Sequence, residues 1–360
     1  MKIVFVNNFW QGIGGGERQL LLVIEGLQSR GVEVQLIAPV GSEIAEATCT
    51  LGAEVTECSL AKSDNLATRK IISEVGTGAD FVVGTGHWTN LLVSGATLGT
   101  DTKKIALHQS MPDAAQGGLE KFIRRLTMTF GLRNIDGHIA VSKAVKDALV
   151  AQGFSAEKIE VIYNGAPLPP RANIVTADSH SPKESPVLGY MGRLEIVKGC
   201  DLLLKTLKTV QETTPDITLR VAGFGSQEDT LRHLANDLDL GEAIDFCGYQ
   251  DSYNFLGSVD MLIMPSRAEA FGLSAVEAQR AGIPVIAFDV GGISEALVSN
   301  TTTKLVPAGD TELLAEAILE MLVRLPQLNN DLQNNAQVVL QNFTPDQTAA
   351  AYYQYFSSKR

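Results

Sequence analysis

The stretch KIVFVNNFWQGIGGGERQLLLVIEGLQSRGVEVQLIA, residues 2–38, decides the fold class. It opens with a short apolar run at residues 2–6 and closes with another at residues 32–38, and both have the length and content of buried strands. Between them, residues 17–30 carry apolar side chains at helical spacing, and Gly31 ends the helix. Two continuous apolar strands joined by a helix predict a parallel sheet that is covered on both faces.

The same alternation of strand and helix continues along the chain, with one interruption. From residue 166 to residue 186 the pattern lapses, and five of the 13 prolines fall there together with several Ser and Thr residues. We interpret this stretch as a linker. The further strands are expected at 80–84, 104–107, 137–141 and 159–162 before it, and at 187–192, 218–222, 244–246, 261–265 and 285–288 after it.

The chain is therefore predicted to hold two doubly wound α/β domains. We expect a first domain at 1–165, the Pro-rich linker at 166–186, a second domain at 187–340, and a C-terminal helix at 341–360 that crosses back to the first domain. A chain of 360 residues with 45% hydrophobic side chains can build two cores. The carboxyl ends of both sheets are expected to face an interdomain cleft, where such folds bind ligands.

Charge and composition exclude several function classes. The formal net charge of −12, from 29 basic and 41 acidic side chains, argues against nucleic acid as a partner, because binding a phosphate backbone needs clustered cations. The four cysteines form no C-x-x-C pair, which argues against a zinc or disulfide framework. No apolar run reaches the ~18 residues of a membrane span, and the first run is too short for a signal peptide. A cytoplasmic location is expected.

The glycine-rich first loop resembles a dinucleotide fingerprint but departs from it. Glu17 stands where the third glycine belongs, and the second strand ends without the acidic residue that holds a ribose. What remains is a glycine-rich turn that runs into a helix, with Gly15 and Gly16 at the junction. The free amides and the positive dipole end of such a helix suit a phosphate group, although such turns often serve close packing alone.

Two cations follow the first strand of the second domain. Arg193 comes directly after Gly192 at the carboxyl end of that strand, and Lys198 precedes the next helix. Arginine offers a planar fork of donors and lysine a compact charge, which together suit a diphosphate.

Two glutamates, Glu269 and Glu277, stand eight positions apart in the segment PSRAEAFGLSAVEA, residues 265–278. A helical separation of eight residues is ~12 Å, whereas the paired carboxylates of glycoside hydrolysis lie ~5 to 9.5 Å apart. They are therefore not expected to form an acid/base pair. We expect Glu269 and Glu277 to accept hydrogen bonds from hydroxyls of different parts of one ligand, with the amides of Gly272 and Leu273 meeting a phosphate between them.

These motifs, in this order, resemble those of retaining family 4 glycosyltransferases, which have the GT-B fold. The resemblance covers nearly the whole chain, and only at Ala270, where the family usually has glycine, does the glutamate segment depart from the pattern. The segments that carry it are Gly14–Arg18, Ala140–Ser142, Val161–Gly165, Gly192–Leu194 with Lys198–Gly199, Ala222–Gly225, the two glutamates, and Gly291–Glu295.

The resemblance implies a role for each matching residue. Arg193 and Lys198 are expected to bind the donor diphosphate and to stabilise the charge that develops as it leaves. Glu269 is expected to contact the transferred sugar, and His108 stands where similar enzymes carry a histidine near that sugar, although a lone histidine is commonly structural. The expected donor-binding residues are Gly15, Gly16, Gly192, Gly223, Phe271, Gly272, Leu273 and Glu277, and Asn164 is expected between the domains.

The implied reaction moves a hexosyl group from a nucleotide diphosphate sugar, with UDP-sugars favoured, to an acceptor hydroxyl with retention. The departing phosphate oxygen would take the acceptor proton, and neither a cofactor nor a metal is expected. The only D-x-D sequence, residues 237–239, reads as helical surface. The acceptor could be a glycan, a lipid-linked sugar or a small molecule, in bacterial polysaccharide, lipopolysaccharide or glycolipid synthesis. The alternatives are a sugar-nucleotide epimerase and a non-catalytic nucleotide-sugar-binding protein.

A basic amphipathic helix is expected at residues 119–133. The surrounding residues 103–146 hold eight Lys or Arg against three acids, a local charge of +5. Two interpretations stay open at this point: peripheral contact with an anionic membrane, or an ordinary helix packed by its apolar face with the cations in water.

Overall fold

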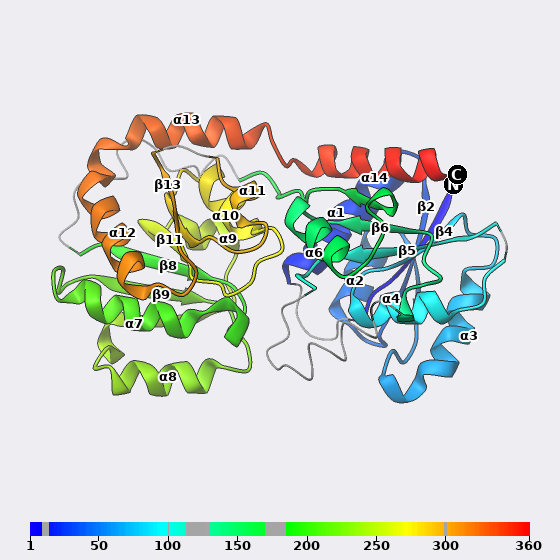
Figure 1. Ribbon diagram of the computed structural model, residues 1–360, viewed down its shortest axis with the longest axis horizontal. Coiled ribbons are helices and arrows are strands. Elements are labelled where there is room, and N and C mark those ends of the chain that lie inside the picture. The colour runs from blue at the N-terminus through cyan, green and yellow to red at the C-terminus, as the bar shows by residue number, and fades with distance from the viewer. Residues whose placement is uncertain (9–13, 100, 113–127, 129, 170–184, 299–300) are drawn as a thin grey trace. The chain divides into compact units, whose positions relative to one another are not determined.

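The computed structural model describes residues 1–8, 14–99, 101–112, 128, 130–169, 185–298 and 301–360. The chain forms two compact units. The first unit comprises Met1–Gly165 and Pro345–Arg360, and the second comprises Ala166–Thr344 (Figure 1). The second unit thus begins at the start of the expected linker, of which residues 170–184 lie outside the described residues.

The first unit is built on a seven-stranded sheet in the order β3-β2-β1-β4-β5-β6-β7. Every neighbouring pair is parallel, and the central strand β4 is buried along its whole length. The strands are β1 (Lys2–Val6), β2 (Glu33–Ala38), β3 (Glu54–Glu57), β4 (Phe81–Gly84), β5 (Lys103–His108), β6 (Gly137–Ala140) and β7 (Ile159–Val161).

The helices of the first unit follow the strands, as crossover connections require. The last helix packs on the first helix and on the sheet. A Cβ on Gly26 of α1 would lie 2.2 Å from the Ala349 Cβ, and the rings of Phe356 and of Phe81 on β4 lie 4.8 Å apart, centre to centre. The helices are α1 (Gly15–Gln28), α2 (Glu43–Thr50), α3 (Asn65–Val75), α4 (His87–Gly95), α6 (Lys143–Ala151) and α14 (Pro345–Lys359), with short 3₁₀ turns at Lys62–Asp64 and Ala156–Lys158.

The second unit has a six-stranded sheet in the order β10-β9-β8-β11-β12-β13, again with every described pair parallel. Alternate residues of each strand enter different cores: Met261 and Ile263 face one, Leu262 and Met264 the other. The strands are β8 (Val187–Met191), β9 (Thr218–Ala222), β10 (Ile244–Gly248), β11 (Met261–Met264), β12 (Val285–Phe288) and β13 (Thr303–Val306).

Helices cover both faces of this sheet, with α7 and α8 on one side and α10 on the other (Figure 1). The apolar face of α7 is buried through Leu203, Leu204 and Leu207, which recur at helical spacing. The helices are α7 (Cys200–Gln211), α8 (Glu228–Asp237), α9 (Ser252–Leu256), α10 (Leu273–Arg280), α11 (Ile293–Ala296), α12 (Thr311–Arg324) and α13 (Asn329–Leu340), with 3₁₀ turns at Ile196–Lys198, Gly241–Ala243 and Leu325–Gln327.

One fully buried arginine holds the second unit together where the chain enters and leaves it. Arg280, at the end of α10, donates hydrogen bonds to the backbone carbonyls of Ala166, Pro167, Val339 and Asn342. Burial lowers the pKa of this guanidinium, and the carbonyl oxygens compensate for the water it has lost.

The fold-class prediction is confirmed, with differences at the edges of the sheets. Strands β3 and β13 were not expected from the sequence. Both are four-residue strands at or near a sheet edge with half-exposed residues, so neither shows a continuous apolar run. The predicted basic helix at 119–133 lies outside the described residues except for residue 128 and residues 130–133. In the described part of the chain no helix has the length and apolarity to cross a bilayer.

Candidate functional site

The loops at the carboxyl end of the second sheet are drawn together by two glycines. Gly199 has a φ of +69°, and a Cβ on it would lie 1.9 Å from the carbonyl oxygen of Pro265. Gly223 has a φ of +137°, and its Cβ would lie 1.9 Å from the carbonyl oxygen of Gly192. Only glycine fits these positions, so the loops after β8, β9 and β11 converge at one edge.

This convergence joins two of the predicted catalytic residues. The Lys198 Nζ lies 2.6 Å from the Glu269 Oε2, and the two side chains are 21% and 12% exposed. Lys198 ends the 3₁₀ turn after β8, and Glu269 lies in the loop after β11. The backbone of Glu269 is also held, because the Gly292 amide donates to its carbonyl at 2.9 Å. A cation and a carboxylate are therefore fixed side by side at a partly open edge of the sheet.

Arg193 lies in the same loop as Lys198 but has no partner among the described residues. Its side chain is exposed and makes no hydrogen bond or ion pair with another described residue. Its backbone is anchored, since the Tyr190 hydroxyl donates to the Arg193 carbonyl at 2.9 Å. Burial raises the pKa of Tyr190 well above its usual value, so this hydroxyl keeps its proton. The guanidinium is available to an anion.

Sequence reasoning missed the ion pair that supports this loop. Arg267 donates from both terminal nitrogens to the two carboxylate oxygens of Asp201, each at 2.7 Å, and also reaches the Ile196 carbonyl at 2.7 Å. Burial acts to raise the pKa of Asp201, but the Arg267 hydrogen bonds prevail and lower it. Both residues stand next to motif positions, yet nothing in their spacing indicated that they meet. The pair ties the 3₁₀ turn of Lys198 to the loop of Glu269.

The remaining residues of the glutamate segment lie at the start of α10. Gly272 caps this helix with a φ of +98°, and Leu273 is its first residue. Glu277 is 5% exposed within the helix. Phe271 is 2% exposed and packs edge-on against Phe343, 5.2 Å between ring centres. The Phe271 side chain is therefore buried in this structure, and its predicted contact with a donor stays a prediction.

The loops after β9 and β10 carry two exposed aromatic rings. Phe224 is 46% exposed and Tyr249 60% exposed, and their ring centres lie 6.5 Å apart. The Gly223 amide donates to the Gly248 carbonyl at 2.7 Å, which joins the two loops. Flat apolar rings at this edge suit stacking of a nucleobase. Sequence reasoning did not predict this pairing of the rings.

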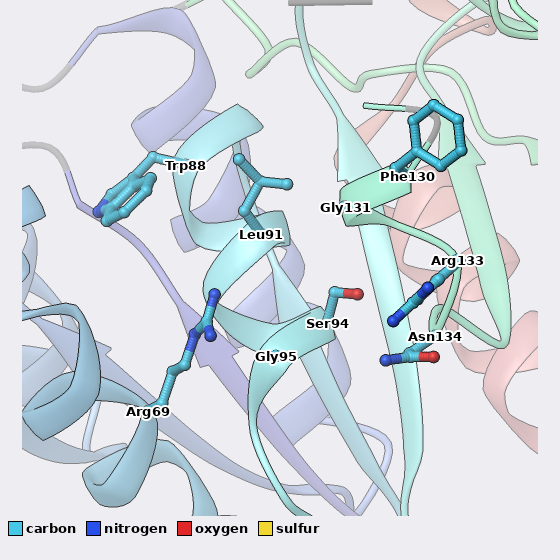
Figure 2. Close-up of a pocket in the computed structure, with 9 residues that line it drawn as sticks. All are labelled: Arg69, Trp88, Leu91, Ser94, Gly95, Phe130, Gly131, Arg133 and Asn134. Atoms are coloured by element: carbon cyan, nitrogen blue, oxygen red, sulfur yellow. The ribbon is translucent and has the colours of Figure 1, made fainter. Parts of the chain in front are cut away.

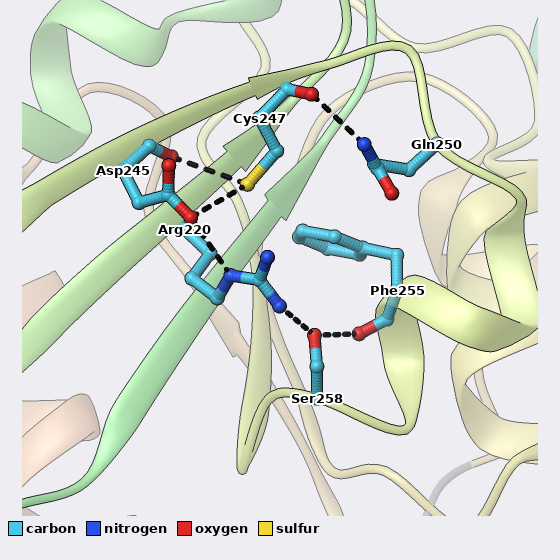
Figure 3. Close-up of polar contacts among 6 residues, drawn as sticks. All are labelled: Arg220, Asp245, Cys247, Gln250, Phe255 and Ser258. Carbon is cyan, nitrogen blue, oxygen red and sulfur yellow. Dashed lines mark hydrogen bonds and ion pairs between the residues drawn. The ribbon is translucent and has the colours of Figure 1, made fainter.

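A polar network holds the bulge that turns β10 toward this loop (Figure 3). Cys247 lies at the bulge, with its Sγ 3.2 Å from the Asp245 carboxylate, and Gln250 donates to the Cys247 carbonyl at 2.8 Å. Arg220 binds Asp245 from the neighbouring strand. Burial, together with the Asp245 carboxylate, raises the pKa of the Cys247 thiol, which disfavours the reactive thiolate form.

In the first unit, Gly15 and Gly16 open α1, as the predicted phosphate site requires. Gly14 caps the helix, and the Gln109 side chain lies over Gly16, where a Cβ would meet its Oε1 at 2.3 Å. Residues 9–13 of the preceding loop lie outside the described residues. Asn164 is 6% exposed, and its Oδ1 has no hydrogen-bond partner among the described residues.

His108 ends β5 and is engaged by a second histidine that the sequence did not single out. The His108 Nε2 lies 3.1 Å from the His138 Nδ1, and both rings are buried. Burial, with smaller contributions from His138 and His87, lowers the pKa of His108 well below its usual value. Burial lowers the pKa of His138 to about 4, assisted by Lys158. Both rings are neutral near pH 7, and of the two His108 nitrogens only Nδ1 remains to meet a ligand.

Acidification is expected to destabilise the first unit through these histidines. Because the folded-state pKa is depressed, their contribution is complete above pH 6.5 and is lost as pH falls toward 4. His138 alone should lower the free energy of unfolding by about 2 kcal/mol between pH 7 and pH 5. Urea unfolding at both pH values measures this. The loss should shrink in His138→Gln and persist in the control His233→Gln, which replaces an exposed histidine; equal losses in all three proteins contradict the prediction.

Among the described residues, no cluster of three or more His, Cys, Asp or Glu side chains is placed so that it could hold a metal ion.

Two family models match, one in each unit. Residues 13–168 match Glycosyltransferase Family 4, and residues 174–339 match Glycosyl transferases group 1. The chain belongs to the family 4 glycosyltransferases. The two matches together span most of its length and confirm the resemblance carried by the motifs.

Curated relatives of this family 4 chain align over part of their length. A GDP-mannose-dependent monoacylated alpha-(1-6)-phosphatidylinositol monomannoside mannosyltransferase of Corynebacterium glutamicum is 36% identical over 148 residues, 38% of each chain. A D-inositol 3-phosphate glycosyltransferase of Saccharomonospora viridis is 33% identical over 182 residues, 47% of this chain and 42% of the relative. The chain spans less than half the length of these relatives.

A solved structure confirms the fold over the whole chain. Anabaena HepE in complex with UDP-glucose has a TM-score of 0.83, with 99% of this chain and 100% of that chain covered at 19% identity. At that identity the likeness establishes the GT-B fold of the family 4 chain, and the fold alone.

Proposed function

We propose that this family 4 chain is a retaining glycosyltransferase that moves a hexosyl group from a nucleotide diphosphate sugar to an acceptor hydroxyl. The observation that carries the proposal is the contact between Lys198 and Glu269, with Arg193 exposed in the same loop. A sugar diphosphate needs cations near its phosphates and, beside them, a carboxylate that accepts hydrogen bonds from the sugar hydroxyls. Arg193 and Lys198 supply the cations, and Glu269 supplies the carboxylate.

The mechanism follows from this arrangement. An ammonium group has three donors, so Lys198 can keep its hydrogen bond to Glu269 while it contacts a donor phosphate. Arg193 adds a planar fork for the second phosphate. As the bond between the anomeric carbon and the phosphate oxygen breaks, the negative charge grows on the diphosphate that these two cations face. The departing oxygen takes the acceptor proton, and the new bond forms on the same face of the sugar.

UDP-sugars are the favoured donors. HepE, which shares the fold, binds UDP-glucose, whereas the corynebacterial relative is named as GDP-mannose-dependent. Phe224 and Tyr249 offer the stacking surface for either base. The acceptor is proposed to be a glycan, a lipid-linked sugar or a small molecule in bacterial polysaccharide, lipopolysaccharide or glycolipid synthesis, and the named relatives act on acceptors that include inositol phosphates and glycolipids.

A donor screen tests the proposal. Thermal unfolding is measured with UDP-, GDP- and ADP-linked sugars, with and without a chelator, and the product of transfer is examined by NMR for its anomeric configuration. We expect one nucleotide sugar to raise the unfolding temperature whether or not the chelator is present, and the product to keep the donor configuration. Absence of stabilisation by every sugar nucleotide, or an inverted product, refutes the proposed activity.

A further inference from the structure

A pocket of roughly 590 Å³ lies on the first unit, and none of its lining residues belongs to the loops described above (Figure 2). It is bounded by α3, α4 and the segment 130–134. The described residues that line it include two arginines, Arg69 and Arg133, and no acid. The proposed reaction uses none of them.

Both arginines turn their guanidinium groups toward the end of α4, from opposite sides (Figure 2). Arg69 lies across Gly95, where a Cβ would be 2.3 Å from its Cζ, so the glycine makes room for the guanidinium. The Arg69 Nε is buried without a hydrogen-bond partner, and neither arginine side chain makes a hydrogen bond or ion pair with another described residue. Two uncompensated guanidinium groups around one pocket are suited to a phosphate.

Two of the elements that bound the pocket, α3 and the segment 130–134, carry exposed apolar side chains. Phe130 is 66% exposed, and Leu66, one turn before Arg69 on α3, is 83% exposed. They are the two most exposed large hydrophobic residues of the first unit among those described. Trp88 lines the pocket with its indole nitrogen bonded to the Leu60 carbonyl at 2.9 Å. Exposed apolar side chains beside cations are the composition of a surface that enters the headgroup region of a bilayer.

We propose that this pocket binds the phosphate of an anionic phospholipid and so docks the first unit on a membrane surface. Arg69 and Arg133 hold the phosphate, while Phe130 and Leu66 enter the acyl boundary. The net charge of −12 opposes approach to an anionic surface, so the attraction has to be local to this patch. Phe130 and Arg133 belong to the described part of the basic helix predicted at residues 119–133. Membrane contact by that helix is one of the two interpretations that the sequence leaves open. The proposal does not depend on transferase activity.

Vesicle sedimentation tests the docking site. The full chain is mixed with phosphatidylcholine vesicles and with vesicles that contain one-third phosphatidylglycerol, at low and at 0.5 M salt. We expect binding to the anionic vesicles alone, weakened by salt. Each arginine contributes about fivefold, so the double variant Arg69→Gln/Arg133→Gln should bind about 25-fold more weakly. The exposed Arg133→Gln alone keeps the test valid if loss of Arg69 impairs folding.

Matched controls separate this site from general charge effects. The control for the arginine variants is Arg232→Gln/Arg324→Gln, which removes the same charge from exposed positions of the second unit. A further site variant, Phe130→Ser, removes an exposed apolar side chain, and its control is Val323→Ser. The controls should bind as the parent does. The proposal fails if the parent does not bind anionic vesicles, or if the controls lose as much binding as the site variants.

Discussion

Replacement of Lys198 by alanine is expected to lower the kcat of sugar transfer by about 10² to 10³, the usual cost of removing one preorganised donor from a developing negative charge. Lys198 is held in place from two sides: Glu269 contacts its ammonium at 2.6 Å, and the Arg267–Asp201 pair ties its turn to the neighbouring loop. The Lys198 ammonium is therefore oriented before negative charge develops on the leaving diphosphate. Loss of Lys198 also leaves the 12% exposed Glu269 carboxylate without its cation.

The measurement is initial-rate kinetics with the donor found in the screen. Lys304→Ala is the control, since Lys304 is an exposed lysine of the same unit whose only described ion pair is with Glu320. Lys198→Arg should recover part of the rate because it restores charge without the compact geometry. If kcat of Lys198→Ala stays within threefold of the parent, Lys198 does not stabilise the leaving group. A rise in KM alone would assign it to donor binding.

Replacement of Arg280 by methionine is expected to lower the free energy of unfolding of the second unit by at least about 3 kcal/mol. Methionine fills much of the same volume but donates no hydrogen bond. Four backbone carbonyls then lose a partner inside the protein, and a buried acceptor left unsatisfied costs about 1–3 kcal/mol. Three of the hydrogen bonds measure 2.7 to 3.3 Å, and the fourth joins Arg280 to Ala166.

Urea unfolding followed by circular dichroism measures this loss. Arg324→Met is the control, because Arg324 lies in an exposed (i,i+4) pair with Glu320, a geometry worth a few tenths of a kcal/mol. Arg280→Lys should fall between the two, since an ammonium can reach only some of the four carbonyls. A midpoint for Arg280→Met equal to that of Arg324→Met would show that water replaces the guanidinium at no cost.

Much of the fold was readable because its signals are local. The strands Lys2–Val6 and Thr218–Ala222 were predicted with their observed bounds, since each is a short, mostly apolar run in a chain that alternates strands with helices. The same reasoning failed at β3 and β13, where one face of a short strand meets solvent. At those positions partner strands, and not the local pattern, decide the structure.

The candidate site was readable in part. The chemistry of Lys198, Glu269 and Arg193 could be inferred because loops after parallel strands gather at one edge of the sheet. The sequence did not show that the Phe271 side chain is buried against Phe343, and its predicted contact with a donor stays a prediction. His138 and Arg267 went unnoticed because their roles arise from contacts with residues 30 and 66 positions away.

The sequence by itself determined two doubly wound α/β units and the residue types at their strand ends, because hydrophobic periodicity and glycine placement act over a few residues. Only the tertiary structure decided which of those residues meet: Lys198 with Glu269, His108 with His138, and Arg280 with four carbonyls. The order of strands in each sheet sets these contacts. That order depends on the packing of a whole unit, which no single segment of the sequence specifies.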